Sequence, residues 1–255
     1  MIRKADYPIL EFDDDRTGLI EPSFMQKKFG KLCSNRLVIS FFKEGINTLL
    51  EEQKIQPYKT ISGENDLVLY KFIGEDVLLM HGVIGCPATA GYLDELTGLG
   101  IEKVMFCGGG GVLDKSIAVG QLLVVEGAIR DEGFSYHYAP PSRVIYAQED
   151  VQRIVRAYLE ENKIPYFSGI TWTTDAFYRE TKALIAHRKE EGAKIVEMEQ
   201  AGCLAVAQFR GIRYGAILYG GDDVSGSVWD DRSWHSRKGI RYSLIEICKE
   251  IVKRM

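Results

Sequence analysis

IVEMEQAGCLAVA, at residues 195–207, places two carboxylates where a short apolar run gives way to a run of small residues. The apolar start favours a buried strand, and the small residues from Ala201 onward favour a closely packed helix. Glu197 and Glu199 therefore fall at the junction of a strand and a helix N-terminus, where the helix dipole favours negative charge. An ionised carboxylate at that place can accept hydrogen bonds from a polyol, and the same pattern also fits an acidic helix cap without a ligand.

Outward from this stretch, apolar runs alternate with segments of helical periodicity. Gly74-Glu75-Asp76 separates two β-rich runs and predicts a tight hairpin. The expected strands are 37–41, 67–73, 77–80, 104–107, 120–129, 166–173 and 214–219, and the expected helices include 43–53, 88–99, 148–162 and 240–255. This alternation predicts one α/β domain at 37–255, with three α/β/α layers around a mixed central sheet. Residues 1–36 are expected to form a leader that packs on the domain or on a neighbouring subunit.

The composition narrows the class of partner. A net charge of −4, without a long basic run, argues against nucleic acid or an anionic membrane and favours a small molecule. The five cysteines lie far apart and form no CxxC, so neither a metal site nor a disulfide framework is expected. No apolar run approaches the roughly 20 residues of a membrane span, and the N-terminus lacks a signal core. We expect a cytoplasmic protein.

Four consecutive glycines, Gly108–Gly111, follow the expected strand at 104–107. Ligands of α/β proteins bind at the carboxyl ends of strands, so the amides of Gly108, Gly109 and Gly110 are candidates for an anion-binding nest. A flexible turn is the alternative. The run matches neither GxGxxG nor GxxxxGK[ST], so a dinucleotide site or a P-loop is not supported.

Several motifs occur in an order that resembles the nucleoside phosphorylase family, which includes uridine phosphorylase and hexameric purine nucleoside phosphorylase. The resemblance covers roughly residues 37–223, and its most specific element is the Val-Glu-Met-Glu block of the opening stretch. The matching segments are Gly85-Cys86-Pro87, Gly108–Gly111, Asp131–Tyr138, Asp175–Tyr178, Val196–Ala201 and Gly221-Asp222.

The resemblance implies a role for each matching residue. Phe177 corresponds to the aromatic residue that stacks on the base, Met198 lies under the ribose, and Glu199 holds the ribose hydroxyls. Glu197 corresponds to a residue near the base. Asp222 corresponds to the aspartate that protonates the base in purine-specific members. A carboxylate near the sugar and an acid near the leaving nitrogen both act on charge that develops in the transition state.

The sequence departs from the family where phosphate binds. The Gly-Asp-Pro-x-x-Arg stretch of members that use phosphate is replaced by Phe41–Gly45, and an arginine and a Ser or Thr are replaced by Phe106 and Gly109. Three charge-assisted contacts of about 1.5–3 kcal/mol each are therefore missing. The residues that read uracil are also absent near Thr181 and Ala183.

These residues favour an enzyme that cleaves the N-glycosidic bond of a nucleoside by phosphorolysis, and they favour a purine over a pyrimidine nucleoside. Phosphate would be a co-substrate and no cofactor is expected. Arg143 or Arg179 are candidates to assist phosphate binding. Hydrolysis, with Glu44 activating water, is the close alternative, and a catalytically silent nucleoside-binding module is the alternative of another class.

The resemblance also implies a homo-oligomer, either a dimer or a trimer of dimers, in which a neighbour completes each pocket. The aromatic loop Arg130–Pro141 is the expected donor. Within it, His137 fits a structural hydrogen-bonding residue better than a ligand contact.

Overall fold

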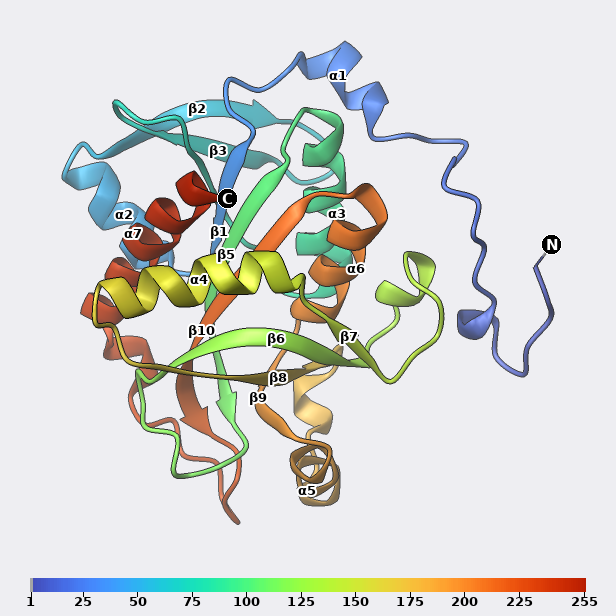
Figure 1. Ribbon diagram of the computed structural model, residues 1–255, viewed down its shortest axis with the longest axis vertical. Coiled ribbons are helices and arrows are strands. Elements are labelled where there is room, and N and C mark those ends of the chain that lie inside the picture. The colour runs from blue at the N-terminus through green and yellow to red at the C-terminus, as the bar shows by residue number, and fades with distance from the viewer. Residues whose placement is uncertain (1) are drawn as a thin grey trace.

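A computed structural model describes residues 2–255, and within them one mixed sheet of ten strands forms the centre of the molecule (Figure 1). The strands are β1 (Arg36–Ser40), β2 (Ile55–Ile61), β3 (Leu67–Phe72), β4 (Leu78–His81), β5 (Lys103–Val112), β6 (Leu122–Asp131), β7 (Val144–Tyr146), β8 (Tyr166–Thr174), β9 (Ala193–Glu197) and β10 (Arg213–Asp223). The α-helices are α1 (Ser23–Phe29), α2 (Lys43–Glu51), α3 (Cys86–Gly98), α4 (Glu149–Glu161), α5 (Lys182–Glu190), α6 (Gln200–Arg210) and α7 (Lys238–Arg254). Short 3-10 helices are η1 (Pro8–Leu10), η2 (Ser135–His137), η3 (Phe177–Arg179) and η4 (Trp234–Ser236).

The mixed sheet flanked by helices confirms the predicted fold class. β3 and β4 form the predicted hairpin and pair antiparallel, whereas β1 runs parallel to β4 and β5. Successive residues of β1 enter different cores, because side chains alternate across a strand. Leu37 and Ile39 belong to the core that includes residues of α3 and α6, and Val38 belongs to the core that includes residues of α2 and α7.

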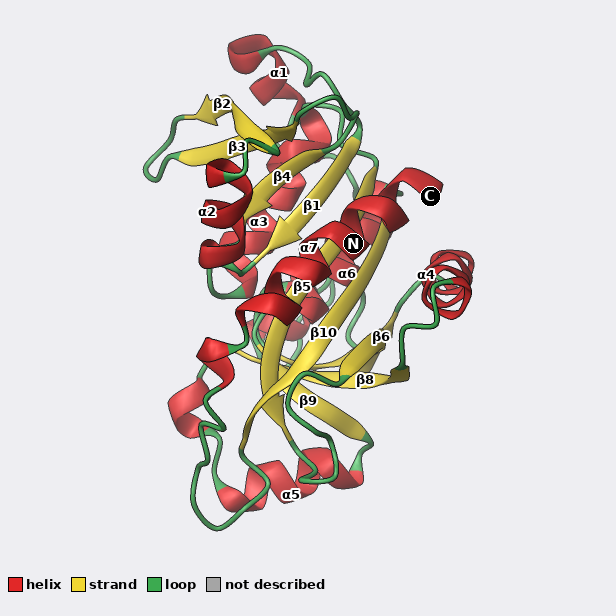
Figure 2. Ribbon diagram, turned by 90° about the vertical axis from the view of Figure 1, so that its left-hand side faces the viewer, coloured by secondary structure: helices red, strands yellow, loops and turns green. Residues whose placement is uncertain are grey.

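Part of the sheet closes into a barrel, which the sequence did not predict. β5 pairs with β10 in parallel, β10 pairs antiparallel with β6, and β6 leads through β8 and β9 back to β5. Figure 2 shows the long β5 and β10 crossing the molecule, with β1, β4, β3 and β2 as the extension on one side. Hydrophobic periodicity identifies strands but not their partners, so this closure was not accessible from the pattern.

The glycine run corrects a prediction. Gly108–Gly111 lie inside β5 and not in a turn, and Gly108 pairs with Leu218 of β10. A Cβ at Gly110 would collide with the carbonyl of Val196, so glycine serves the close approach of neighbouring backbones here. β2 and β7 were also missed, because only the two end residues of β2 are buried and β7 has only three residues.

The N-terminal segment lies along one side of the domain. α1 packs against α3, and the carbonyl of Pro22 lies so close to Gly98 that a side chain there would collide with it. Leu19 and Ile20 are exposed, and Figure 1 shows the chain before them running out along the surface. Contact with a neighbouring subunit stays a prediction. Over residues 2–255, the helices are all too short or too polar to span a membrane.

Candidate active site

The candidate site lies where two strands that share one edge of β5 diverge. β1 pairs with β5 as far as Cys107, and β9 pairs with β5 from Gly111. The edge between these two residues faces no paired strand in the described part of the chain. The chain that leaves β1 at Phe41 and the chain that leaves β9 at Met198 therefore flank an opening in the sheet.

Gly109 is the residue of β5 whose backbone faces this opening. On the same edge, the carbonyl of Cys107 accepts a hydrogen bond from the amide of Phe41 (3.2 Å), and the amide of Leu113 donates to a carbonyl of β9 (3.0 Å). Because backbone groups alternate between the two edges of a strand, Gly109 shares their direction and Gly108 and Gly110 turn toward β10. The predicted nest of three amides is therefore replaced by a single amide.

Glu197 joins the end of β9 to the start of α6. Its Oε1 accepts hydrogen bonds from the hydroxyls of Thr171 (2.9 Å) and Thr173 (2.5 Å), and its Oε2 accepts from the amides of Glu199 (2.6 Å) and Gln200 (2.7 Å). Burial raises the pKa of this carboxyl, and the hydrogen bonds oppose that rise. A carboxylate has about four acceptor positions, so none is left for a base. The geometry favours a positioning role over the predicted contact with the base.

Glu199 lies between the N-termini of two helices. It is the N-cap residue of α6, and its Oε1 accepts a hydrogen bond from the amide of Gly85 (2.7 Å), the N-cap residue of α3. Burial and the charge of Glu197 raise its pKa to about 8. The backbone amides of Gly85 and of the partly buried Met198 oppose that rise. No hydrogen bond from another side chain of residues 2–255 reaches this carboxyl, so its Oε2 is a candidate acceptor for a ligand.

Phe177 follows β8, which pairs with β9, and Asp222 lies at the end of β10, which pairs with β5. β8 and β9 run in parallel with Thr173 opposite Glu197, so the η3 turn that carries Phe177 follows the strand beside Glu197. The ring of Phe177 is 48% exposed and is therefore open to a ligand. Asp222 lies at the end of β10, and its Oδ2 accepts a hydrogen bond from Trp229 Nε1 (2.6 Å). The sequence reasoning missed Trp229, although an indole seven residues beyond an expected acid was a visible signal.

Aromatic rings fill the other side of the opening, where β1 and β4 end beside Cys107 of the continuing β5. The ring of Phe41 packs on Phe106, with 5.2 Å between ring centroids, and a Cβ at Gly82 would collide with Phe41. Glu44, the predicted activator of water, forms an ion pair with the buried Arg241 of α7. Its carboxylate is therefore engaged, and the prediction that it activates water is not supported.

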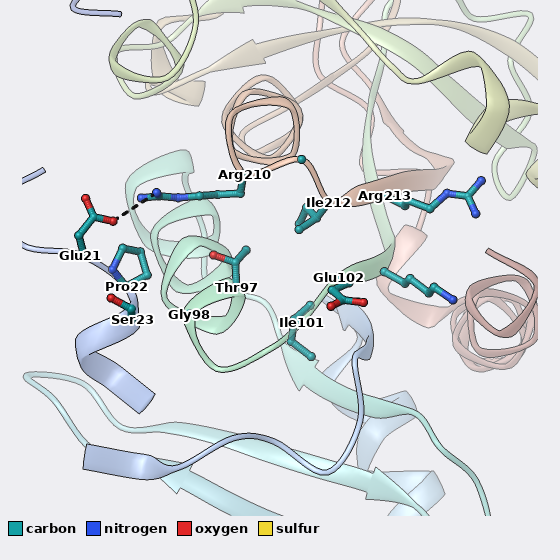
Figure 3. Close-up of a pocket in the computed structure, with 12 residues that line it drawn as sticks. Glu21, Pro22, Ser23, Thr97, Gly98, Ile101, Glu102, Arg210, Ile212 and Arg213 are labelled. Carbon is teal, nitrogen blue, oxygen red and sulfur yellow. Dashed lines mark ion pairs between the residues drawn. The ribbon is translucent and has the colours of Figure 1, made fainter. Parts of the chain in front are cut away.

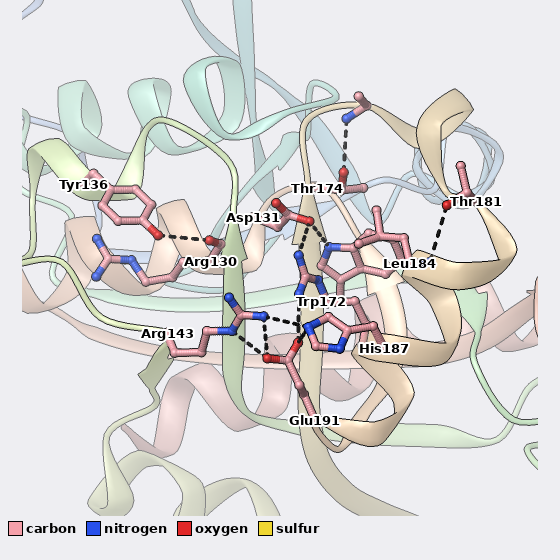
Figure 4. A network of polar contacts seen from close by, with 12 residues as sticks. Arg130, Asp131, Tyr136, Arg143, Trp172, Thr174, Thr181, Leu184, His187 and Glu191 are labelled. Atoms are coloured by element: carbon pink, nitrogen blue, oxygen red, sulfur yellow. Dashed lines mark hydrogen bonds and ion pairs between the residues drawn. The ribbon is translucent and has the colours of Figure 1, made fainter. Parts of the chain in front are cut away.

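A polar network behind the site fixes α5 and, with it, the loop that bears Phe177 (Figure 4). Asp131 of β6 accepts hydrogen bonds from Trp172 Nε1 (3.0 Å) and from Arg188 of α5 (2.8 Å). Arg143 donates to Glu191 (2.5 Å) in the same network, so it is already paired and is a poor candidate to hold phosphate. Arg179 is exposed, and His137 is exposed as well rather than a hydrogen-bonding centre of its loop.

A cleft of about 590 Å³ lies at the opposite end of the barrel (Figure 3). It is lined in part by Lys103 and Arg213, the first residues of β5 and β10, whereas Gly109 and Asp222 lie toward the other ends of these strands. Arg210 in this cleft is paired with Asp94 (2.6 Å). None of the predicted site residues lines it. Within residues 2–255 no group of three or more potential metal ligands is found.

Residues 35–243 match the family model described as "Phosphorylase superfamily". The chain belongs to this superfamily. A guanosine phosphorylase of Halorubrum lacusprofundi is 30% identical over 154 residues, which are 60% of this chain and 64% of that protein. The chain thus spans about three fifths of the length of the curated relatives that it matches.

Solved structures of the superfamily share the fold. The structure of a uridine phosphorylase from Vibrio fischeri matches with a TM-score of 0.71 and 21% identity, over 87% of this chain and 93% of that one. An AMP nucleosidase from Bacteroides thetaiotaomicron matches with a TM-score of 0.67 and 20% identity, over 88% and 95%. The Phosphorylase superfamily fold therefore occurs in proteins named phosphorylases and in one named a nucleosidase.

Proposed function

We propose that this protein is an enzyme that cleaves the N-glycosidic bond of a purine nucleoside. The observation that carries the proposal is Glu199, which is buried between two helix N-termini with its Oε2 as a candidate acceptor at the opening along β5. That oxygen is suited to accept a hydrogen bond from a ribose hydroxyl, with Met198 beside the sugar. The superfamily membership and the name of the guanosine phosphorylase support a nucleoside as substrate.

The neighbouring side chains suit the rest of a nucleoside. The half-exposed ring of Phe177 offers a face on which a base can stack, and Asp222 offers a carboxyl for the leaving nitrogen. Departure of the base leaves positive charge on the sugar and negative charge on the base. Glu199 would stabilise the first and a protonated Asp222 would neutralise the second.

Phosphorolysis is the first candidate reaction, because the relatives that match in sequence are named phosphorylases. In this chain the amide of Gly109 is the backbone donor that faces the opening. The exposed Arg179, five residues beyond the end of β8, is a cation that could assist. The base and ribose 1-phosphate would be the products.

Hydrolysis is the second candidate, and the aromatic rings of Phe41, directly after β1, and Phe106, within β5, favour it. Phe41, backed by the buried Phe106, replaces polar ligands with an apolar group, and a phosphate dianion beside it would lose hydration without gaining a paired cation. Water carries no such penalty. The fold does not separate the two reactions, since it occurs in proteins named for each.

A product assay separates the candidates. The purified protein is incubated with guanosine, inosine and adenosine, with and without inorganic phosphate, and the sugar product is identified. Ribose 1-phosphate that forms only with phosphate establishes phosphorolysis, and free ribose at the same rate without phosphate establishes hydrolysis. Tight nucleoside binding without cleavage by phosphate, arsenate or water would show a binding module and would overturn the enzymatic proposal.

A further inference from the structure

Glu180 is a partly buried carboxylate without a partner. It lies directly after η3 and before Thr181, whose hydroxyl accepts the amide of Leu184 and caps α5. In the part of the chain that the structure describes, residues 2–255, the Glu180 side chain makes no hydrogen bond and no ion pair. The backbone amide of Glu180 donates to the carbonyl of Phe177 (3.3 Å), so one turn carries both the exposed ring and the carboxylate.

Glu180 shares its surroundings with Asp222. Burial, and then the negative charge of Asp222, raise the pKa of Glu180 to about 7. The one hydrogen bond of Asp222 to a side chain comes from Trp229. Two carboxyls from separate strand ends thus lie near each other, and no cation contributes to the pKa shift of Glu180.

The two buried carboxylates around the site, in contrast, accept hydrogen bonds from groups of the protein. Glu197 accepts four hydrogen bonds, and Glu199 accepts one from Gly85 and has Oε2 as a candidate acceptor for a ligand. Withdrawing a carboxylate from water without a partner is unfavourable, so such a group in a native structure calls for an explanation. At the rim of a base-stacking ring, the partner is most simply the base itself.

We propose that Glu180 determines base specificity by accepting hydrogen bonds from the N1–H and 2-amino groups of guanine. This inference rests on the proposed function, because it takes the nucleoside to lie on Phe177 with N7 of its base toward Asp222, which would protonate the base there as the bond from N9 to the sugar breaks. A carboxylate accepts hydrogen bonds and, when ionised, donates none. It therefore matches a base edge with two adjacent N–H donors.

Purine chemistry then ranks the substrates. Guanine presents two donors on this edge, hypoxanthine presents one, and adenine presents an acceptor at N1 and no donor beside it. On a 6-oxopurine, N7 and N1 lie on either side of O6. With Asp222 at N7 and Glu180 at N1, the two carboxyl groups would lie near each other without a direct hydrogen bond. The effect of the Asp222 charge on the pKa of Glu180 agrees with this arrangement.

The experiment compares guanosine, inosine and adenosine in the wild type, Glu180→Gln, Glu180→Asp and the control Glu190→Gln. Glu190 is an exposed carboxylate of α5 and should leave all three activities unchanged. Because a site that loses its acceptor discriminates strongly against the donor it served, Glu180→Gln should lower kcat/KM for guanosine about 30- to 100-fold. Adenosine should change less than about threefold, and Glu180→Asp should recover part of the guanosine activity.

Equilibrium binding of the free bases guanine and adenine provides a readout that does not depend on turnover. Glu180→Gln should weaken guanine and not adenine. An equal loss for all substrates and bases would indicate a structural role and overturn the inference, as would an unchanged preference for guanosine. If the wild type cleaves no nucleoside but binds guanine through Glu180, the proposed function fails and the inference stands. If the wild type cleaves nucleosides and the cleavage does not depend on Glu180, the proposed function stands and the inference about Glu180 fails.

Discussion

The two sides of the opening along β5 differ in the groups that they present: one carries hydrogen-bonded carboxylates and the other carries packed aromatic rings. Around Glu197 and Glu199, which we call the carboxylate side, strand ends and helix N-termini supply donors at 2.5–2.9 Å. Around Phe41 and Phe106, the aromatic side, rings pack on each other and on Gly82. The carboxylate side is preorganised for one polar ligand group, whereas the aromatic side excludes charge. Under the proposed function, the contrast means that this chain keeps groups for the sugar and the base and differs on the side from which the nucleophile attacks.

The largest expected effect is at Asp222, which under the proposed function protonates the leaving base whichever nucleophile attacks. Asp222→Asn should lower kcat by about 10²- to 10⁴-fold, the usual contribution of general acid catalysis, with the fold unchanged. Asp223→Asn is the matched control, because its Oδ1 accepts the amide of Ser225 instead of facing a ligand. Base release under saturating substrate measures both. Near wild-type turnover in Asp222→Asn would remove this residue from the mechanism.

Glu197→Gln tests whether the carboxylate side is built by hydrogen bonds. An amide at this place turns an NH₂ toward donors, so two of the four hydrogen bonds are lost. We expect the free energy of unfolding to fall by about 2–4 kcal/mol, measured by urea denaturation. Thr171→Val, which removes one donor, should cost about 1 kcal/mol. A stability equal to that of the wild type would contradict the positioning role.

Glu199→Gln should weaken the sugar contact more than the fold. Above pH 8, where Glu199 is ionised, replacing this charged acceptor with a neutral one should raise KM about 10- to 50-fold, in line with the strength of charge-assisted hydrogen bonds. The dissociation constant of the free base should stay unchanged, because the base contacts other residues. If the variant bound ribose and base equally poorly, Glu199 would not belong to the sugar contact specifically.

The raised pKa of Glu199 makes the stability of the carboxylate side depend on pH. Its pKa is about 8 in the folded protein against an ordinary value of 4.5, so between these values the folded state holds more protons than the unfolded state. The contribution of Glu199 to stability is therefore present below pH 4.5 and is lost as pH rises through 8. Between pH 5 and pH 8, the wild type should lose at least about 1.4 kcal/mol more than Glu199→Gln, the equivalent of one pKa unit. Parallel pH profiles in urea denaturation would argue against this burial effect.

Phe177→Ala should have the smallest of these effects. Loss of one stacking contact should raise KM about tenfold, since stacking of a base on an aromatic ring is worth about 1–3 kcal/mol. Tyr178→Ala is the control, because Tyr178 is 89% exposed on the same turn. Its ring lies 4.1 Å from that of Phe177, so a small effect through the neighbouring ring is expected. Equal losses in both variants would shift the stacking role to the pair.

Removing one ring from the aromatic side tests whether these rings select the nucleophile. Phe41→Ala removes the ring that packs over Gly82 while keeping Phe106 in place. If the rings keep phosphate out, this variant should gain dependence on phosphate relative to the wild type. The rates with and without phosphate measure the change, and an unchanged ratio would show that the rings do not select the nucleophile.

The sequence alone determined much of this protein. Periodicity placed most strands and helices, the hairpin of β3 and β4, and the junction at Glu197–Glu199, because these features depend on neighbours within a few residues. The ordered motifs led to the correct superfamily. The sequence also showed that Phe41 and Phe106 stand where phosphate-using members of the family have other residues, since replaced residue types can be read directly from a sequence.

The tertiary structure decided which groups are free. Because β5 pairs with β10, the glycine run forms a strand instead of the predicted anion nest or turn. The amide of Gly109 is the one that faces the opening. Four donors from β8 and the start of α6 bind Glu197, Arg241 of a distant helix pairs with Glu44, and Glu180 is left without a partner in the described chain. Such outcomes depend on contacts between residues far apart in the chain, which local patterns do not encode. The sequence therefore supplied the candidate groups, and the folded structure determined which of them remain to bind a substrate.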